Sequence, residues 1–311
     1  MSRAVVTGGA GFIGSHIVEE LLANNYEVIV VDNFTTGHYR NISHLPIKIY
    51  DYDITDPSCI DFISSLNPEY IIHQAAQVSV AESVHDILHD ENVNVKGSLH
   101  VIKAGIKASI KKIVFASSAA VYGNPHFLPV TTDHPTTPES PYGLTKLTVE
   151  RYLQMAYKFY QLPYSILRYS NVYGPRQDAK GEGGVVSIFA DKIAEGKAPV
   201  IFGDGEQTRD FIYVKDVAKA NVKAMEAQGN ICVNISTQTK ITVNELWETM
   251  VKAGDIQLKA EHQAARPGDI LHSTLCNQKT LDVLNWVPQT SLETGLKETL
   301  VFTRSMLQGT K

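Results

Sequence analysis

The sequence has few residues that could carry metal or thiol chemistry, and it has no excess of positive charge. Its three cysteines, Cys59, Cys232 and Cys276, show no C-x-x-C or other metal-ligand spacing. We therefore expect no bound metal, and inert thiols in a reducing compartment. Lys and Arg number 28 against 33 Asp and Glu, for a formal net charge of -5. That balance argues against nucleic acid or an anionic membrane as a partner.

Long apolar segments are also missing. No uninterrupted apolar stretch reaches the length that spans a bilayer, so we expect no membrane anchor. The first strand-like run begins near residue 3, which predicts that no signal peptide precedes it. We expect a cytoplasmic protein. A chain of 311 residues is long enough for one large α/β unit and a smaller appendage.

The opening segment VVTGGAGFIGSH has the pattern of a strand, a tight turn and a helix. Gly9, Gly11 and Gly14 fit G-x-G-x-x-G, and Gly8, Gly11 and Gly14 fit the related G-x-x-G-x-x-G. Such glycines allow the turn, the approach of bare backbone to a pyrophosphate, and close contact between strand and helix. The amphipathic helix at Ser15–Leu22 then presents its positive N-terminal end to the phosphates. The segment predicts a dinucleotide site.

An acidic residue selects among dinucleotides. The next predicted strand, Val28–Val31, ends at Asp32, about 20 residues after the glycines. A carboxylate there accepts hydrogen bonds from a ribose 2′-hydroxyl and repels a 2′-phosphate, which predicts NAD rather than NADP. His38 and Arg40 follow closely, so a weaker NADP activity stays open. Asp53, after the third strand-like run, is expected near the adenine; the alternative is a solvated loop acid.

Strand-like runs alternate with helical patterns through the first half of the chain, which predicts an α/β fold. The arrangement is a Rossmann-like, doubly wound parallel sheet with right-handed crossovers. The expected NAD-binding domain spans residues 1–172 and is rejoined by about 212–238, while 173–311 form mainly a smaller mixed α/β substrate-binding domain. Further strands are expected at Ile47–Tyr50, Tyr70–His73, Ile113–Ala116, Ser165–Tyr169 and Ile231–Asn234, and helices at Glu82–Ala108, Pro141–Tyr160 and Val214–Glu226.

A tyrosine and a lysine lie four residues apart in the segment SPYGLTK. About one helical turn separates them, so Tyr142 and Lys146 project from the same helix face. A neighbouring ammonium favours the phenolate of a tyrosine and so makes it a usable base near neutral pH. Ser118 follows a predicted strand and is expected to point into the same cleft. Taken singly, Ser118 is typical of a strand-end cap and Tyr142 of a half-buried aromatic; together, behind a dinucleotide-binding opening, the three predict a catalytic site.

The chain resembles the extended short-chain dehydrogenase/reductase family over nearly its whole length. The resemblance rests on TGGAGFIGSH, HQAAQVSVAES, FASSAAVYG, SPYGLTK, LRYSNVYGPRQ and GDGEQTRDFIYVKD, and it is strongest toward members that epimerise UDP-hexoses at C4. It implies a Ser–Tyr–Lys site, tightly held NAD, a UDP-hexose substrate, and a homodimer built through two long helices, here Glu91–Ala108 and Tyr142–Tyr160. It also implies that NAD is lined by Gly8, Gly11, Phe12, Ile13, Gly14, Asp32, Asn33, Asp53, Ile54, Gln74, Ala75, Gln77, Asn94, Tyr142, Lys146 and Tyr169.

The residues that follow Ser118 discriminate among reactions of this family. Related 4,6-dehydratases place an Asp-Glu pair there to eliminate water, and decarboxylating relatives place a glutamate. Here the positions hold Ala119 and Ala120. Small residues leave room for a sugar that turns over, so the resemblance implies epimerisation through a transient 4-keto sugar.

Residues in the second half of the chain are expected to bind the UDP-hexose. Guanidinium forks suit phosphate oxygens, so Arg209 and Arg266 are the expected diphosphate clamp. The alternatives are an ion pair of Arg209 with Asp210 or Glu206, and a solvated Arg266. The other expected contacts are Asn171 to a phosphate or sugar oxygen, Val186 near the uridine pocket, Phe202 beside the uracil, and Asp269 at the uridine ribose.

A position four residues past Asp269 is expected to decide which hexose fits. It is Ser273 here, whereas enzymes restricted to glucose and galactose carry a bulky tyrosine. A serine leaves space for a 2-acetamido group, so we expect UDP-GlcNAc/UDP-GalNAc interconversion beside that of UDP-Glc/UDP-Gal. Two alternatives stay open. One is another nucleotide-sugar enzyme of the same fold, such as a 4-reductase or an epimerase of a different sugar; the other is a non-catalytic NAD(H) sensor, which has no need of an intact Ser–Tyr–Lys set.

Overall fold

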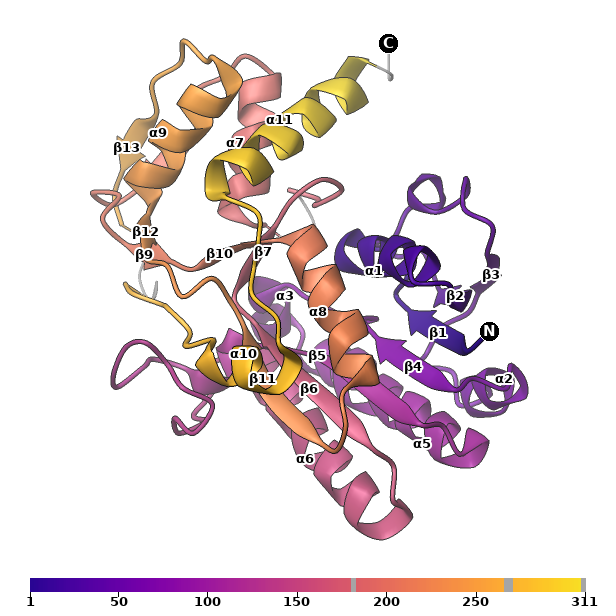
Figure 1. Ribbon diagram of the computed structural model, residues 1–311. Helices are drawn as coiled ribbons and strands as arrows, with labels where there is room; N and C mark the ends of the chain where they lie inside the picture. Colours follow the sequence, from indigo (N-terminus) through magenta and orange to yellow (C-terminus); the bar gives the residue numbers. More distant parts are fainter. Residues whose placement is uncertain (180–182, 266–270, 309–311) are drawn as a thin grey trace.

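The computed structural model describes residues 1–179, 183–265 and 271–308, and a seven-stranded parallel sheet lies at its centre (Figure 1). The strand order is β11-β6-β5-β4-β1-β2-β3. The chain adds β2 and β3 on one side of β1, then crosses back and adds β4 and the later strands on the other side. This confirms the predicted doubly wound, Rossmann-like α/β fold. The strands are β1 (Arg3–Thr7), β2 (Glu27–Asp32), β3 (Lys48–Asp51), β4 (Tyr70–His73), β5 (Lys112–Ser118), β6 (Tyr164–Tyr169) and β11 (Ile231–Ile235).

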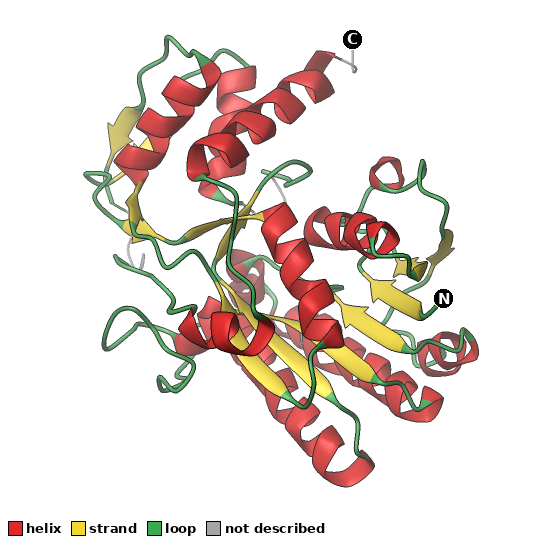
Figure 2. Cartoon of the chain, in the orientation of Figure 1, coloured by secondary structure: helices red, strands yellow, loops and turns green. Residues whose placement is uncertain are grey.

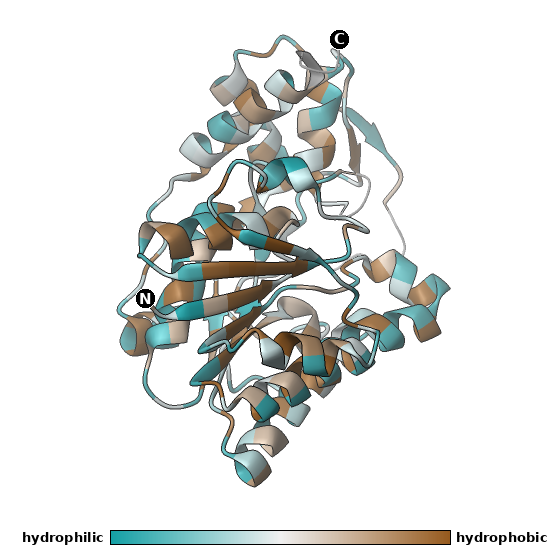
Figure 3. Ribbon diagram, turned by 90° about the vertical axis from the view of Figure 1, so that its right-hand side faces the viewer, coloured by the Kyte–Doolittle hydropathy of each residue, from teal (hydrophilic) through white to brown (hydrophobic). Residues whose placement is uncertain are grey.

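Helices cover both faces of this sheet, so its strands are apolar on both sides (Figures 2 and 3). Consecutive residues of a strand point to opposite faces, and Val5 and Val6 of β1 accordingly enter two different cores. On one face lie α1 (Phe12–Ala23), α8 (Val214–Glu226) and α10 (Gln278–Leu284). On the other face lie α2 (Cys59–Ser65), α5 (Ser98–Ala108) and α6 (Pro141–Tyr160).

Most of the later elements form a smaller unit with its own core beyond the carboxyl ends of the strands (Figure 1). Phe189, Trp247 and Leu296 are the centre of that core. The helices are α7 (Val185–Ala194), α9 (Val243–Gly254) and α11 (Leu292–Gln308). The short strands are β7 (Asn171–Tyr173), β8 (Val200–Phe202), β9 (Thr208–Arg209), β10 (Phe211–Tyr213), β12 (Ile241–Thr242) and β13 (Glu261–Gln263).

One predicted element is wrong in extent. The single helix expected at Glu82–Ala108 is divided into α3 (Val80–His85), α4 (Ile87–Glu91), a π-helix (Asn92–Gly97) and α5. The first break is at Asp86, whose backbone is non-helical and whose side chain accepts a hydrogen bond from the His89 N–H, so it caps a new helix. Similarly, the strand expected at Ile47–Tyr50 begins and ends one residue later, at Lys48–Asp51.

In the part of the chain that the structure describes, every helix is too short or too polar to cross a membrane. The same residues contain no group of three or more His, Cys, Asp or Glu side chains placed to hold a metal ion. Burial raises the pKa of the Cys59 thiol to about 12 and that of Cys232 to about 11. Both thiols are therefore weak nucleophiles at neutral pH.

Candidate active site

The glycine turn between β1 and α1 forms a bare backbone surface. Gly8 has φ +70°, and a Cβ placed on it would lie 2.6 Å from the Ala75 nitrogen. A Cβ on Gly14 would lie 2.1 Å from the Gly8 carbonyl oxygen, so only glycine allows α1 to start this close to β1. Gly11, at the N-terminal cap of α1, supplies no capping side chain. The first-turn N–H groups of α1 are thus available to an anion such as a pyrophosphate.

Asp32 stands at the end of β2 with its carboxylate fixed. One oxygen accepts a hydrogen bond from the Ala10 N–H at 2.8 Å, and the other accepts from the Phe34 N–H at 2.8 Å. Burial raises the pKa of the Asp32 carboxyl above its usual value. The side chain lines the cavity beyond the glycine turn, where the predicted contact to a ribose would be made.

That cavity has a volume of about 600 Å³ and follows the carboxyl ends of β1, β2, β3 and β4. It contains most of the residues predicted for NAD. The predicted residues that line it are Gly8, Gly11, Phe12, Ile13, Gly14, Asp32, Asn33, Asp53, Ile54, Gln74, Ala75 and Gln77. Further lining residues, absent from the prediction, are Val31, Thr35, Thr36, Asn41, Tyr52, Thr55, Ala76, Val78, Ser79, Glu82, His89, Asn92, Val93, Arg176 and Asp178.

Asp53 is a structured acid at the rim of this cavity. Its carboxylate accepts hydrogen bonds from the Asn33 side chain at 3.0 Å and from the Thr55 N–H at 2.7 Å. Although burial opposes the effect, these donors lower the pKa of Asp53. The residue is therefore held in place, unlike a freely solvated loop acid.

Four residues predicted to contact NAD are not among those that line this cavity: Asn94, Tyr142, Lys146 and Tyr169. Asn94 is buried, and its amide accepts from the Gln77 N–H and donates to the Gln77 carbonyl oxygen, each at 2.9 Å. Tyr169 is buried at the end of β6; its hydroxyl donates to the Asn221 side chain at 3.0 Å and accepts from Gln74 at 3.1 Å. Burial raises the pKa of Tyr169 to about 12. The Asn94 and Tyr169 side chains both support residues that line the cavity.

Ser118 ends β5, and Tyr142 and Lys146 lie in the first turns of α6, which packs against that strand. Ser118 is the last residue of β5, and its hydroxyl oxygen accepts a hydrogen bond from the Ala120 N–H at 3.2 Å. It therefore caps the short 3₁₀-helix Ala119–Tyr122, and its catalytic role stays a prediction. Gly143 lets α6 approach this strand end, because a Cβ there would lie 2.5 Å from the Ala120 carbonyl oxygen.

Lys146 is almost fully buried one turn along α6 from Tyr142. Its ammonium donates to the Ala116 carbonyl oxygen at 3.0 Å and lies 5.7 Å from the centre of the Tyr142 ring. Burial lowers the pKa of Lys146 to about 8, an effect that the Asp90 carboxylate partly offsets. The lysine is thus still largely protonated at neutral pH and can stabilise a phenolate beside it.

The predicted substrate residues are spread over the smaller unit. Arg209, in β9, donates to the Thr208 carbonyl oxygen at 2.9 Å, and that same oxygen accepts from the Ser273 N–H at 3.2 Å. The structure therefore brings Arg209 and Ser273 together. Asn171 begins β7, and Phe202 ends β8. Arg266 and Asp269 lie outside the described residues.

Two further residues on this side have structural contacts. Val186 is 2% exposed and packs into the core of the smaller unit, and its contact to uridine stays a prediction. Asp210 has a structural role: its carboxylate accepts hydrogen bonds from the Thr237, Gln238 and Leu275 N–H groups. It ties β10 to two neighbouring loops.

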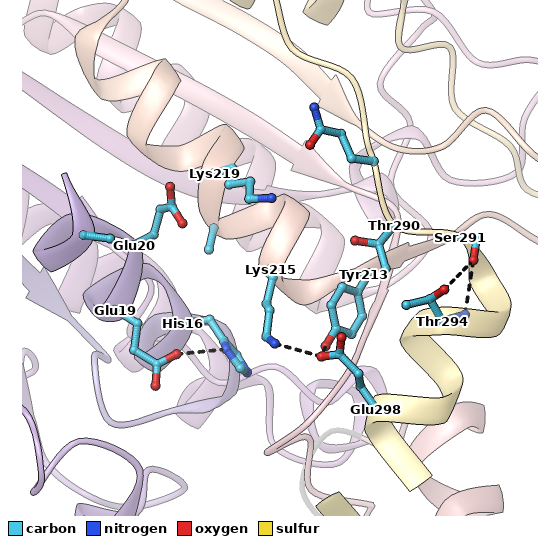
Figure 4. Close-up of a pocket in the computed structure, with 13 residues that line it drawn as sticks. His16, Glu19, Glu20, Tyr213, Lys215, Lys219, Thr290, Ser291, Thr294 and Glu298 are labelled. Atoms are coloured by element: carbon cyan, nitrogen blue, oxygen red, sulfur yellow. Dashed lines mark hydrogen bonds and ion pairs between the residues drawn. The ribbon is translucent and has the colours of Figure 1, made fainter. Parts of the chain in front are cut away.

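Arg176 is the clearest lining residue that the sequence did not reveal. Its guanidinium donates to the Ser15 hydroxyl at 3.0 Å and pairs with Glu19 at 2.5 Å, both on α1. Glu19 also pairs with His16, at 3.4 Å, on the wall of a second cavity between α1, α8 and α11 (Figure 4). Although burial opposes it, hydrogen bonds from His16 and Arg176 lower the pKa of Glu19 to about 2. In the sequence, Arg176 is marked only by its place in GPRQ, within one of the segments that carry the family resemblance.

Comparison with known proteins gives consistent matches along the chain. The model of the "NAD dependent epimerase/dehydratase family" matches residues 4–236. A Mycolicibacterium smegmatis protein named UDP-glucose 4-epimerase is 38% identical, and the alignment covers 98% of this chain and 100% of that protein.

Solved structures agree with these matches. The UDP-glucose 4-epimerase of Thermotoga maritima, solved with UDP-glucose, has a TM-score of 0.94 at 42% identity and covers 98% of this chain and 99% of its own. The UDP-N-acetylglucosamine 4-epimerase of Methanobrevibacter ruminantium M1, in complex with UDP-N-acetylmuramic acid, has a TM-score of 0.93 at 36% identity, with coverage of 98% and 99%.

Proposed function

Because the chain belongs to the NAD-dependent epimerase/dehydratase family, we propose that it is a UDP-hexose 4-epimerase that interconverts UDP-glucose and UDP-galactose. The predicted resemblance to extended short-chain dehydrogenases/reductases and the NAD cofactor are both confirmed. The observation that carries the proposed reaction is the pairing of Tyr142 with buried Lys146 on α6, beside Ser118 at the end of β5.

The cavity suits NAD in shape and chemistry. Its glycine turn offers backbone that a Cβ would fill, and the N-terminal end of α1 offers N–H groups to the pyrophosphate. Asp32 would accept from the ribose hydroxyls, and Arg176 would neutralise phosphate charge. When bound there, NAD would supply the hydride acceptor and donor for C4 of the sugar, with no net formation of NADH.

The protein's own residues handle the proton. Tyr142 as phenolate, assisted by the Ser118 hydroxyl, removes the proton from the sugar 4-hydroxyl and later returns it. Lys146 holds the phenolate electrostatically, since its ammonium is buried beside the ring. Ala119 and Ala120 follow Ser118 and are too small to obstruct a 4-keto sugar that rotates about its diphosphate.

A coupled assay tests the proposal. Purified protein supplied with UDP-galactose and a trace of NAD should form UDP-glucose. UDP-glucose dehydrogenase, added together with an excess of NAD, then oxidises this product with a visible rise in NADH. No NADH should accumulate before the coupling enzyme is added. A net change in NAD(P)H without the coupling enzyme would point to a reductase or dehydrogenase instead and overturn the proposal.

The proposal extends to N-acetylated hexoses. It is supported by the small Ser273 beside Arg209 and by the similarity to the M. ruminantium UDP-N-acetylglucosamine 4-epimerase. A serine at this position leaves room for the 2-acetamido group that a larger side chain would displace.

Arg176 is expected to contribute to NAD affinity. Replacing it with alanine removes charge-assisted hydrogen bonding to phosphate, which should weaken NAD binding by roughly 10- to 100-fold. Isothermal titration with NAD measures this, with Arg304→Ala, an exposed arginine on α11, as the matched control. An Arg176→Ala protein with wild-type NAD affinity would contradict this role.

We further propose a homodimer, in which a second copy covers an exposed apolar surface. That surface combines α3 and α4, which pack on α6, with α6 itself. The predicted helix Glu91–Ala108 contributes less than expected, because Val101, Ile102 and Ala104 of α5 are buried in the core. Its exposed apolar side chains include Val80, Val84, Ile87 and Leu88 on α3 and α4, and Leu144, Tyr152 and Met155 on α6.

The expected solution state is a dimer of 34.3 kDa chains. Leu88 is 75% exposed, and Leu88→Arg combined with Met155→Arg should yield monomers, because two charges would be buried without partners. Light scattering after size exclusion measures this. Val301→Arg, at an exposed apolar position on α11, is the control and should stay dimeric. A monomeric wild-type protein would contradict the proposal.

A further inference from the structure

A buried carboxylate lies between the wall of the NAD cavity and the catalytic helix. Asp90, on the short helix α4, is 0% exposed, whereas its neighbour Glu91 is exposed. One Asp90 oxygen accepts from the Gln77 side-chain amide at 2.8 Å and from Asn94 at 2.9 Å. The other accepts from the Thr145 hydroxyl at 3.0 Å. Burying a carboxylate costs free energy unless hydrogen bonds compensate for the lost water. Three side-chain donors converge on Asp90, which indicates that its carboxylate has a specific role.

The three donors belong to the parts of the protein that must be aligned for turnover. Gln77 lies in the loop after β4 and lines the NAD cavity. Asn94 belongs to the π-helix and fixes the backbone of the same loop by accepting from the Gln77 N–H and donating to its carbonyl oxygen. Thr145 immediately precedes Lys146 on α6. Asp90 thus connects the loop that lines the NAD cavity to the turn of α6 that carries Lys146.

We propose that Asp90 is a positioning residue that fixes the Gln77 loop to α6 and supplies the countercharge for buried Lys146. The inference rests on the proposed epimerase function, in which Lys146 holds the Tyr142 phenolate. Neither the family resemblance nor the residue patterns of the sequence assign Asp90 a role.

Two other titratable groups face Lys146, and neither is a carboxylate that could supply its countercharge. Tyr142 faces Lys146 from the same helix, and His73 faces it from the end of β4. His73 is neutral, because burial, followed by the Lys146 charge, lowers the pKa of His73 to about 3. Burial lowers the pKa of Lys146 to about 8, and the Asp90 carboxylate acts in the opposite direction.

The sign of the expected effect follows from this. An opposite charge favours the protonated lysine, so removing the Asp90 charge lowers the pKa of Lys146 further. Lys146 must carry its proton to hold the phenolate, so activity is lost as the pH rises through its pKa. In Asp90→Asn, which keeps the shape of the side chain, the alkaline limb of kcat should therefore move to lower pH. NAD affinity should also fall, by roughly tenfold for one lost hydrogen bond to charge.

Three control variants separate charge from packing. Thr145→Val removes one hydrogen bond to Asp90 but keeps the charge, so kcat should fall without movement of the alkaline limb. Glu91→Gln removes an exposed charge from the same helix and should change neither quantity. Asp90→Glu keeps the charge and should leave the limb in place even where kcat falls; if Asp90→Asn does not fold, a limb that moves in Asp90→Glu overturns the proposal.

A second readout does not depend on turnover. The Lys146 side chain can be titrated by NMR in protein with ¹³C-labelled lysine, with Lys146→Arg used for assignment. Its titration should shift to lower pH in Asp90→Asn and not in Thr145→Val. Equal losses of kcat in these two variants, with no shift of either titration, would overturn the proposal. If the wild-type protein fails to epimerise UDP-glucose, the proposed function falls, and the NMR titration still decides the role of Asp90.

Discussion

A Tyr142→Phe variant should lose about a thousandfold in kcat for UDP-galactose, since general acid–base catalysis by a positioned side chain contributes roughly 10²- to 10⁴-fold. The ring remains beside Lys146, and only the hydroxyl that exchanges the proton is removed. The folded state and NAD binding should therefore persist. The coupled UDP-glucose assay measures the loss, and a thermal melt with bound NAD checks that the protein is intact.

The matched control is Tyr152→Phe. Tyr152 lies on the same helix but is 45% exposed, away from the buried lysine, so its hydroxyl should be dispensable for turnover. Near-normal turnover by Tyr142→Phe would remove the basis of the proposed chemistry. Equal losses in both variants would indicate damage to α6 rather than loss of a catalytic group.

A Ser273→Tyr variant should lose activity on UDP-GlcNAc by roughly a hundredfold and retain activity on UDP-glucose. The added phenol ring would occupy the space of the 2-acetamido group, and an overpacked site costs about 1–3 kcal/mol or more. The backbone of Ser273 is held by the Thr208 carbonyl oxygen, so the larger side chain cannot easily withdraw. Parallel rates on the two sugars measure the change.

Ser273→Ala is the control for this prediction. It removes the hydroxyl without adding volume, so both sugars should still turn over. Equal loss of the two activities in Ser273→Tyr would show that the position does not select by size. That result would not contradict the proposed epimerisation of UDP-glucose and UDP-galactose.

The sheet could be predicted because each buried strand is a short apolar run followed by a helical pattern. The extent of the helix after β4 could not, since its helical periodicity reveals neither a local cap nor a tertiary contact within it. Asp86 caps α4, and the Asn94 side-chain amide hydrogen-bonds the backbone of Gln77, in the loop that lines the cavity. Helical periodicity along residues 82–108 contains no sign of either contact.

The same distinction holds within the site. Glycine spacing and a tyrosine four residues before a lysine are local patterns with a known chemical need, so they were visible in the sequence. Arg176 meets Ser15 across 161 residues, and Asp90 meets Thr145 across 55. Neither contact has a local signal.

The central claim is that this chain epimerises UDP-hexoses at C4 without consuming its cofactor. The most direct measurement is a proton NMR time course of the purified protein with UDP-glucose and, separately, UDP-GlcNAc, each with a trace of NAD. We expect the galacto-configured anomeric signal to grow to a fixed ratio with each sugar, with no build-up of NADH. Unchanged spectra for both sugars, or product formed only in proportion to NAD(H) consumed, would contradict the claim.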